Sequence, residues 1–215
     1  MIISLTGFMG CGKSSVGRKL SQLLCCPFMD LDAEIEKRCG CSVAEIFAER
    51  GEAEFRMLEK ETLKDILETS GRVLEIPKTP ALPTVGHPLA GGGMSSPSSS
   101  TPACKNQEDP SNERPQMILA LGGGAVMTPE CEKMVHEQTK CIYLRTSVKE
   151  LVARLTDESA GRPLLASSDL KTRIETLMSL RMETYERTAH LIIDTDSKTI
   201  DEVASEITAA LPARR

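Results

Sequence analysis

The stretch Gly7-Phe-Met-Gly-Cys-Gly-Lys-Ser14 constrains this chain most, because it matches the phosphate-binding loop pattern GxxxxGK[ST]. Glycines in such a loop let successive backbone N–H groups point inward, next to the positive end of a helix. An apolar, β-branched run precedes the loop at residues 1–6, and helically spaced Val16 and Leu20 follow it. Strand, loop and helix in this order predict a polyphosphate site. The alternative is a glycine-rich turn that binds no ligand.

The residues of this loop have separate expected roles toward ATP. We expect Lys13 at the β- and γ-phosphates and the Ser14 hydroxyl at a Mg²⁺ ion. The residues expected to contact ATP here are Gly10, Cys11, Gly12, Lys13, Ser14 and Ser15. We also hypothesise that the converging N–H groups activate the Cys11 thiol for oxidation. The loop predicts the cosubstrate and leaves the reaction open.

Length and composition favour a single domain without a nucleic-acid surface. The chain has 215 residues, a net charge of −5 and no cluster of Lys and Arg, so it offers no basic face for nucleic acid. It also lacks an apolar stretch of the ~20 residues that a membrane span needs, and no charged leader precedes the first strand. We expect a cytoplasmic monomer with no membrane partner. Its eight cysteines lack zinc-finger spacing and are expected to be reduced.

Two aspartates lie at the end of the next predicted strand. Residues 27–32 are typical of a short strand that ends in Asp30 and Asp32. Ligands of open α/β sheets bind at the carboxyl ends of the strands, and residues i and i+2 of an extended chain point the same way. We therefore expect both carboxylates at one site. The alternative is that Asp32 only caps a helix over residues 33–38.

Helical signals follow these aspartates. The capping box Ser42-Val-Ala-Glu45 predicts a short helix that ends before Gly51. The apolar stripe of residues 52–70 then predicts a long helix that ends at Gly71. Arg56 lies in the first turns of this helix. Taken alone, it is more typical of a solvated arginine than of a ligand-binding one.

Residues 77–116 differ from the rest of the chain in composition. Eight of the twelve prolines lie there, with a serine-rich run at residues 95–100 and few bulky apolar side chains. Such a segment cannot bury enough surface to offset the entropy of ordering it. We predict a disordered or loosely held insertion within a single domain of residues 1–215. It could gate the substrate pocket or bind a partner, but a tolerated loop is the simpler interpretation.

The triple glycine Gly122–Gly124 has a superficial repeat at residues 91–93 inside the insertion. Only the former follows a strand-like run, at residues 117–121, and precedes a helix start at residues 128–130. We assign function to it, because glycines at a strand end indicate a close approach to the backbone; a plain turn is the alternative. Residues 72–76 also resemble a strand, but attachment to the glycines favours residues 117–121 as the strand in the sheet.

The last third of the chain alternates strands and helices around a polar loop. A strand is expected at residues 140–145, and the capping box Ser147-Val-Lys-Glu150 predicts a helix that ends near Leu155. Residues 156–169 hold Gly-Arg162-Pro and predict a mobile lid whose arginine reaches the transferred phosphate on closing. The remaining expected elements are a helix at residues 170–188, a strand at 190–194 and a helix at 199–211.

Five strands separated by helices predict an α/β fold of three layers, with a parallel sheet covered on both faces. This succession favours a small P-loop kinase over a GTPase or a motor, which usually needs a longer chain.

Together these motifs resemble the shikimate kinase family, over nearly the whole chain outside residues 77–116. The motifs are Gly7–Ser14, Asp30 with Asp32, Phe55-Arg56 with Glu59, Gly122–Gly124, Arg162-Pro-Leu-Leu165, and Arg181 followed by Tyr185. The resemblance implies transfer of the γ-phosphate of ATP to the 3-hydroxyl of shikimate, in aromatic amino acid biosynthesis. It also implies a five-stranded sheet of order 2-3-1-4-5.

The resemblance implies which residues bind shikimate. Asp32 would hold the hydroxyls and orient or deprotonate the attacking one. Arg56, Arg181 and the backbone N–H of Gly123 would bind the carboxylate and the ring hydroxyls. Two arginine forks, one amide and one acid match the single carboxylate and three hydroxyls of this substrate.

The resemblance likewise implies the groups around ATP. Asp30 would hold Mg²⁺ together with Ser14, and Arg154 would stack near the adenine. Arg162 corresponds to the lid arginine, which with Lys13 places positive charge where the γ-phosphate builds up negative charge.

Two other functions remain open at this point. A different small-molecule P-loop kinase, such as gluconate kinase, shares the loop, the lid and the size, but the set of Asp-x-Asp, Phe-Arg and triple glycine argues against it. A nucleotide-dependent regulatory module without catalysis would not need Asp32 or Arg162. The sequence also leaves open whether Asp32 is a base or only a positioning group.

Overall fold

The computed structural model describes residues 1–72, 115–158 and 169–211 of the chain. Within these residues, five strands form one parallel sheet in the order β2-β3-β1-β4-β5. The strands are β1 (Ile2–Thr6), β2 (Phe28–Asp30), β3 (Met117–Ala120), β4 (Thr139–Arg145) and β5 (Leu191–Asp194). The predicted fold and strand order are confirmed, and residues 117–120 form the strand that precedes the triple glycine.

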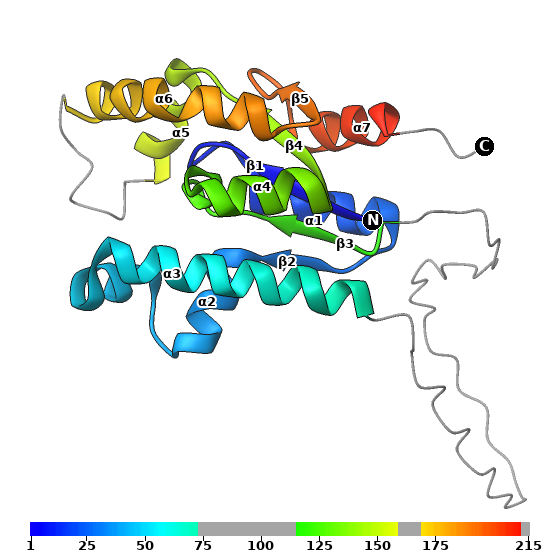
Figure 1. Cartoon of the computed structure of the whole chain (residues 1–215). Helices are drawn as coiled ribbons and strands as arrows, with labels where there is room; N and C mark the ends of the chain where they lie inside the picture. The colour runs from blue at the N-terminus through cyan, green and yellow to red at the C-terminus, as the bar shows by residue number, and fades with distance from the viewer. Residues whose placement is uncertain (73–114, 159–168, 212–215) are drawn as a thin grey trace, which may run out of the picture.

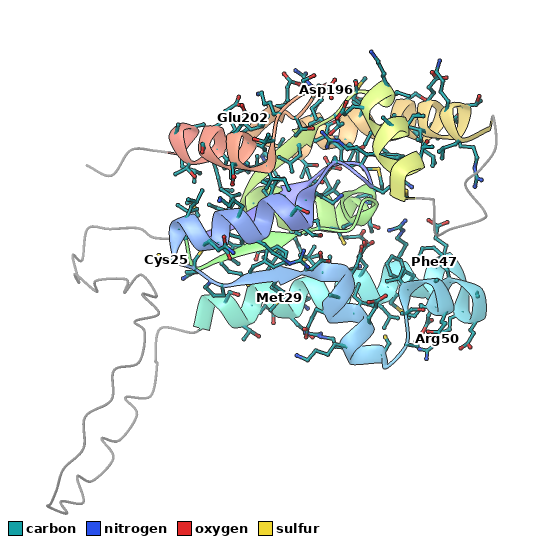
Figure 2. All side chains as sticks on the ribbon, turned by 180° about the vertical axis from the view of Figure 1, so that it is seen from behind. Cys25, Met29, Phe47, Arg50, Asp196 and Glu202 are labelled. Carbon is teal, nitrogen blue, oxygen red and sulfur yellow. The ribbon has the colours of Figure 1, made fainter. Side chains whose placement is uncertain are left out.

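Helices cover both faces of this sheet. They are α1 (Lys13–Leu24), α2 (Leu31–Cys39), α3 (Val43–Arg72), the 3₁₀ turn η1 (Ala125–Met127), α4 (Pro129–Gln138), α5 (Val148–Glu158), α6 (Asp169–Thr188) and α7 (Ile200–Ala210). Figure 1 shows α3, α4 and α6 on the side that faces the viewer, and the reverse view in Figure 2 shows α1 and α7 in front of the sheet. All of β1 is buried, as expected for a central parallel strand.

Alternate residues of the central strands feed two separate apolar cores. On β4, Cys141 and Tyr143 pack with residues of α3 and α4. Between them, Ile142 and Leu144 point to the opposite face and pack with residues of α1 and α7. This follows from the two-residue period of a strand. The two cores hold the sheet rigidly between the helix layers, so that the loops at its carboxyl edge are fixed in place.

Strand β2 is shorter than expected from the sequence. It ends at Asp30, and Asp32 lies in the first turn of α2. The reason is that the Asp30 carboxylate accepts a hydrogen bond from the Asp32 backbone N–H at 3.1 Å and thereby caps the helix. The expectation of two aspartates on an extended chain was therefore wrong, and so was the alternative that Asp32 is the cap.

Helix α3 contains the predicted break but continues beyond its predicted end. Gly51 has φ 80° and ψ 174°, so the helix is kinked there, and the Phe47 ring packs at a tilt against Phe55 across the kink with ring centroids 4.6 Å apart. Figure 2 labels Phe47 on the segment before the kink. The helix extends past Gly71 to Arg72, so the possible strand at residues 72–76 begins in a helix; its remaining residues lie outside those described.

The two predicted capping boxes differ in outcome. The first is formed, since Ser42 N–H donates to Glu45 and Glu45 N–H donates to Ser42 Oγ. At the second, Glu150 N–H donates to Ser147 Oγ, but Ser147 N–H donates to Asp196, which precedes α7. A tertiary contact thus replaces half of the second box. The helix that it starts extends to Glu158, three residues beyond its predicted end.

The insertion and the lid fall mostly outside the described residues. Of residues 77–116, the structure describes 115 and 116, and Gln116 N–H donates to Met1 O at 2.8 Å beside the sheet. Of the lid, residues 156–158 belong to α5 and Asp169 begins α6, whereas Arg162 is not among the described residues. No helix in the described part of the chain is long and apolar enough to cross a membrane. A cytoplasmic location stays a prediction.

Candidate active site

The phosphate loop joins β1 to α1 in the conformation that its glycines permit. Gly7, Gly10 and Gly12 all have positive φ, and Gly12 is the N-cap of α1 at φ 95° and ψ 15°. A Cβ at Gly7 would lie 2.7 Å from the carbonyl oxygen of Leu144, so this position excludes a side chain on steric grounds as well. The N-terminus of α1 therefore faces the loop without a side-chain cap, as an anion site requires.

Lys13 and Ser14 begin α1 directly after the glycines of the loop. Lys13 Nζ donates to the carbonyl oxygens of Gly7 and Phe8, both at 2.9 Å, and so spans the loop. Ser14 Oγ donates to Asp30 Oδ2 at 2.6 Å. A hydroxyl and a carboxylate are the oxygen ligands that Mg²⁺ prefers. The residues predicted to hold the metal are thus in contact, and their chemistry fits it.

Two cavities adjoin the phosphate loop. The first, of about 290 Å³, is lined by Lys13, Ser14, Asp30, Asp32, Gly123 and their neighbours. The second, of about 620 Å³, is lined by Cys11, Val16, Glu150, Arg154, Thr195 and the start of α7. Gly10, Gly12 and Ser15 line both cavities. The loop therefore separates one acid-lined cavity from a larger one, an arrangement that suits two substrates with a phosphate between them.

Asp32 and Glu59 place two carboxylate oxygens against the triple glycine. Asp32 Oδ1 and Glu59 Oε1 are buried and have no hydrogen-bond partner among the described residues. Both lie next to Gly122, where an added Cβ would be 2.7 Å from the first oxygen and 2.8 Å from the second. Burial raises the pKa of Asp32, as does the neighbouring Asp30, and Lys13 and Arg56 oppose this rise. Burial also raises the pKa of Glu59, although the hydrogen bond and the charge of Arg56 act to lower it.

Arg56 lies on the same side of the triple glycine. Its guanidinium donates to Glu59 Oε2 at 2.7 Å and to Glu52 Oε1 at 3.1 Å. Burial acts to lower the pKa of Arg56, but the hydrogen bonds and charges of the two glutamates outweigh it and raise that pKa. Because Glu59 is almost fully buried, this pair fixes the arginine at the rim of the site. The interpretation of Arg56 as a merely solvated arginine is wrong.

Helix α6 approaches the triple glycine from the other direction. Arg181 donates to the carbonyl oxygen of Gly123 at 3.2 Å, and the Tyr185 hydroxyl donates to the same oxygen. The Arg181 guanidinium also lies 5.9 Å from the centroid of the Phe8 ring, in the phosphate loop. The structure therefore brings Arg181 to the glycine turn, and its predicted contact with shikimate stays a prediction. Arg181 contacts the carbonyl of Gly123, whereas the predicted contact of Gly123 with shikimate is through its N–H group.

Arg154 borders the larger cavity on the far side of the loop. Its Nε donates to Glu150 Oε1 at 3.0 Å, and a terminal nitrogen donates to Thr195 O at 3.2 Å. A second terminal nitrogen reaches the carbonyl oxygen of Cys11 at 3.5 Å. These contacts fix the guanidinium between α5, the phosphate loop and the turn that leads to α7. This position is consistent with the predicted place beside a nucleotide base.

A model of the shikimate kinase family matches residues 9–76 and 108–212 of the chain. The chain belongs to the shikimate kinase family. The unmatched residues between these two ranges fall inside the predicted insertion, so this insertion is the part in which the chain departs from the family pattern.

Individual shikimate kinases match over almost the whole chain. The chain is 31% identical to shikimate kinase of Thermus thermophilus over 209 residues, which cover 97% of this chain and 89% of that protein. It is 34% identical to shikimate kinase of Bordetella pertussis over 211 residues, covering 98% of this chain and 78% of that protein. The solved shikimate kinase from Acinetobacter baumannii in complex with shikimate superposes with a TM-score of 0.69 at 26% identity, covering 96% and 90% of the two chains.

The structure does not support the hypothesis that the Cys11 thiol is activated for oxidation. The side chain is 1% exposed and belongs to the apolar core beneath the loop, with Lys13 Nζ 3.8 Å from its sulfur. A thiol must be accessible to be oxidised readily. Cys11 lines the larger cavity, but its side chain is buried in the apolar core.

The sequence did not assign a physical role to some of the residues at the site. Glu59 and Tyr185 were part of the family pattern only, and Glu150 and the Thr195 carbonyl, which hold Arg154, were not identified. Glu59 carried a usable signal, because an acid three residues after an arginine on a helix predicts an ion pair. The Thr195 carbonyl carried none, since a backbone acceptor has no sequence signature.

Proposed function

We propose that this shikimate kinase family member transfers the γ-phosphate of ATP to the 3-hydroxyl of shikimate, giving 3-phosphoshikimate and ADP in aromatic amino acid biosynthesis. The observation that carries the proposal is the carboxylate of Asp32, whose Oδ1 is buried beside Gly122 with no partner among the described residues. A buried acceptor of this kind needs a donor. A substrate hydroxyl in the adjoining cavity would supply it.

Asp32 acts on the attacking hydroxyl in this proposal. It accepts the hydrogen bond of the 3-hydroxyl and orients the oxygen toward the phosphate loop. Burial and the nearby acids raise the pKa of Asp32, which makes its ionised form a better proton acceptor. The proton of the hydroxyl passes to this carboxylate as the new oxygen–phosphorus bond forms, and ADP leaves.

The carboxylate of shikimate binds between two arginines. Arg56 enters from α3 beside Gly124, and Arg181 enters from α6 at the Gly123 carbonyl. Each guanidinium presents further N–H groups that suit a carboxylate, and the Gly123 N–H adds a neutral donor. Glu59 holds Arg56 in place at 2.7 Å and so prepares it for the substrate.

ATP binds across the phosphate loop, with its base in the larger cavity beside Arg154 and its phosphates at Gly10, Cys11, Gly12 and Ser15. Lys13 would exchange its bonds to the Gly7 and Phe8 carbonyls for the β- and γ-phosphates. Ser14 and Asp30 would hold Mg²⁺, which when bound neutralises charge on the phosphates. We assign Arg162 to the same task on the strength of the family resemblance, and we propose a cytoplasmic monomer with residues 156–169 as its lid.

Phosphorus NMR of the product tests the position of transfer. After incubation with shikimate, ATP and magnesium, the new phosphate ester should show coupling to the ring proton at carbon 3. Coupling to the proton of another hydroxyl-bearing carbon would contradict the proposed pose of shikimate against Asp32.

A further inference from the structure

The three carbonyl groups of the triple glycine are each held by a hydrogen bond, but not by the same kind of partner. Gly122 O accepts from Ala125 N–H at 3.1 Å and Gly124 O accepts from Met127 N–H at 3.0 Å, both within the turn itself. Gly123 O accepts from the side chains of Arg181 and Tyr185, which come from α6. The central peptide of the turn is therefore oriented from outside.

The orientation of this peptide also sets the direction of the Gly124 N–H group. In a trans peptide the N–H lies opposite the carbonyl, so fixing Gly123 O toward α6 fixes the Gly124 N–H away from it. Glycines resist backbone rotation less than other residues. Without the two side chains of α6, the Gly123 carbonyl would have no hydrogen bond from the described residues to hold it.

The two partners of Gly123 O have different duties in the proposed function. Arg181 must engage the substrate carboxylate, and a turn of its guanidinium toward that carboxylate would draw it away from Gly123 O. The Gly123 carbonyl is part-buried, so losing its protein partners would cost some free energy. The Tyr185 hydroxyl lies within hydrogen-bond reach of Arg181 as well, but it makes no contact with the substrate that would draw it away from the carbonyl. It can keep the carbonyl paired when Arg181 turns to the substrate.

We infer that Tyr185 is a positioning residue for shikimate: its hydroxyl holds the Gly123 peptide so that Arg181 is free to bind the substrate carboxylate. This inference rests on the proposed function. Tyr185 itself is fully buried and reaches the site only through the Gly123 carbonyl, so it does not touch the substrate.

The chain offers a matched control in Tyr143. This residue lies on β4, is 1% exposed where Tyr185 is 0% exposed, and stacks on the Tyr185 ring with centroids 5.2 Å apart. Its hydroxyl is buried and has no hydrogen-bond partner among the described residues. Replacing either tyrosine by phenylalanine removes one buried oxygen from the same stack, but only Tyr185→Phe removes a hydrogen bond from the Gly123 carbonyl and leaves Arg181 as its side-chain partner.

The test compares wild type, Tyr185→Phe and Tyr143→Phe in shikimate-dependent ADP release and in thermal unfolding. We expect Tyr185→Phe to raise KM for shikimate about tenfold, the ratio that corresponds to one hydrogen bond of about 1.4 kcal/mol. KM for ATP and kcat should stay within about twofold of wild type, and Tyr143→Phe should match wild type in all three constants.

Three results would overturn the inference. Equal KM values for shikimate in the two variants would show that the hydroxyl of Tyr185 has no special role. A lower melting temperature with unchanged KM and kcat would assign that hydroxyl to stability alone. Wild type without shikimate-dependent ADP release would refute the proposed function, and the inference with it, whereas the first two results leave the proposed function intact.

Discussion

The guanidinium of Arg56 occupies the space that a side chain at Gly124 would need. A Cβ built on this glycine would lie 2.5 and 2.6 Å from the two terminal nitrogens of Arg56. Gly124 itself has φ −118° and ψ 0°, which other residues also adopt. The glycine is therefore required by the position of the arginine and not by its own backbone.

Gly124→Ala tests this relationship. The added methyl group should displace the flexible end of Arg56 without straining the turn, so the melting temperature should change by only a few degrees. We expect KM for shikimate to rise at least about tenfold while KM for ATP is unchanged. Steady-state kinetics with each substrate varied in turn checks this. An unchanged KM for shikimate would show that Arg56 can bind it from another position.

Removal of Arg56 should have a larger effect than removal of a neighbouring cation. Arg56→Ala takes away a substrate contact and leaves the buried Glu59 without its partner, so we expect KM for shikimate to rise about a hundredfold and stability to fall by about 2 kcal/mol. Lys60, on the same helix, pairs with Glu130 at the surface, and Lys60→Ala should change KM less than twofold. Similar KM values for the two variants would refute the assignment of Arg56.

Asp32→Asn separates the two roles that the sequence leaves open for Asp32. If the carboxylate accepts the proton, the amide should lower kcat at least about a hundredfold at saturating shikimate. The variant should also unfold at a higher temperature, because it removes one of the acids crowded against Asp30 and Glu59. A rise in KM with little change in kcat would assign Asp32 to positioning alone.

His190 should make the stability of the sheet depend on pH. Its Nδ1 accepts a hydrogen bond from Cys141 N–H at 3.1 Å, which requires this nitrogen to be unprotonated. Partial burial lowers the pKa of His190, and the nearby His136 and Lys140 add to this effect. The unfolded chain then binds the proton more readily, so the free energy of unfolding should fall as the pH drops through the ordinary value of 6.5.

Urea unfolding at about pH 7.5 and pH 5.5 measures this dependence. In His190→Asn the side-chain oxygen can accept the same hydrogen bond without titrating, so the loss of stability between the two pH values should be smaller than in wild type. An equal loss in both proteins would show that other groups account for the pH dependence.

The fold was predictable because its signals are local and periodic. The glycines and Lys13 of the phosphate loop, the β-branched strands and the helical stripes each act over a few neighbouring residues, and their order predicts a parallel sheet. The predicted ends and caps of helices and strands were less accurate where an aspartate side chain forms a hydrogen bond that the local pattern does not indicate. Asp30 ends its strand by capping α2, and Asp196 takes the N–H of Ser147 that a capping box would use.

At the site, the sequence identified residue types better than their physical roles. The triple glycine was expected to bring a ligand close to the backbone, and the structure adds that Gly122 and Gly124 make room for Asp32, Glu59 and Arg56. That reason joins residues far apart in the chain, so no local pattern contains it. The same holds for the Tyr185 hydroxyl at the Gly123 carbonyl, which depends on how α6 packs against the turn.

The most direct test of the account is ADP release by the purified full chain with magnesium and ATP, measured with shikimate, with gluconate and with no acceptor. We expect release that depends on shikimate alone. Release with gluconate instead would contradict the assigned substrate pocket, and tight ATP binding without release in any of the three would contradict catalysis itself.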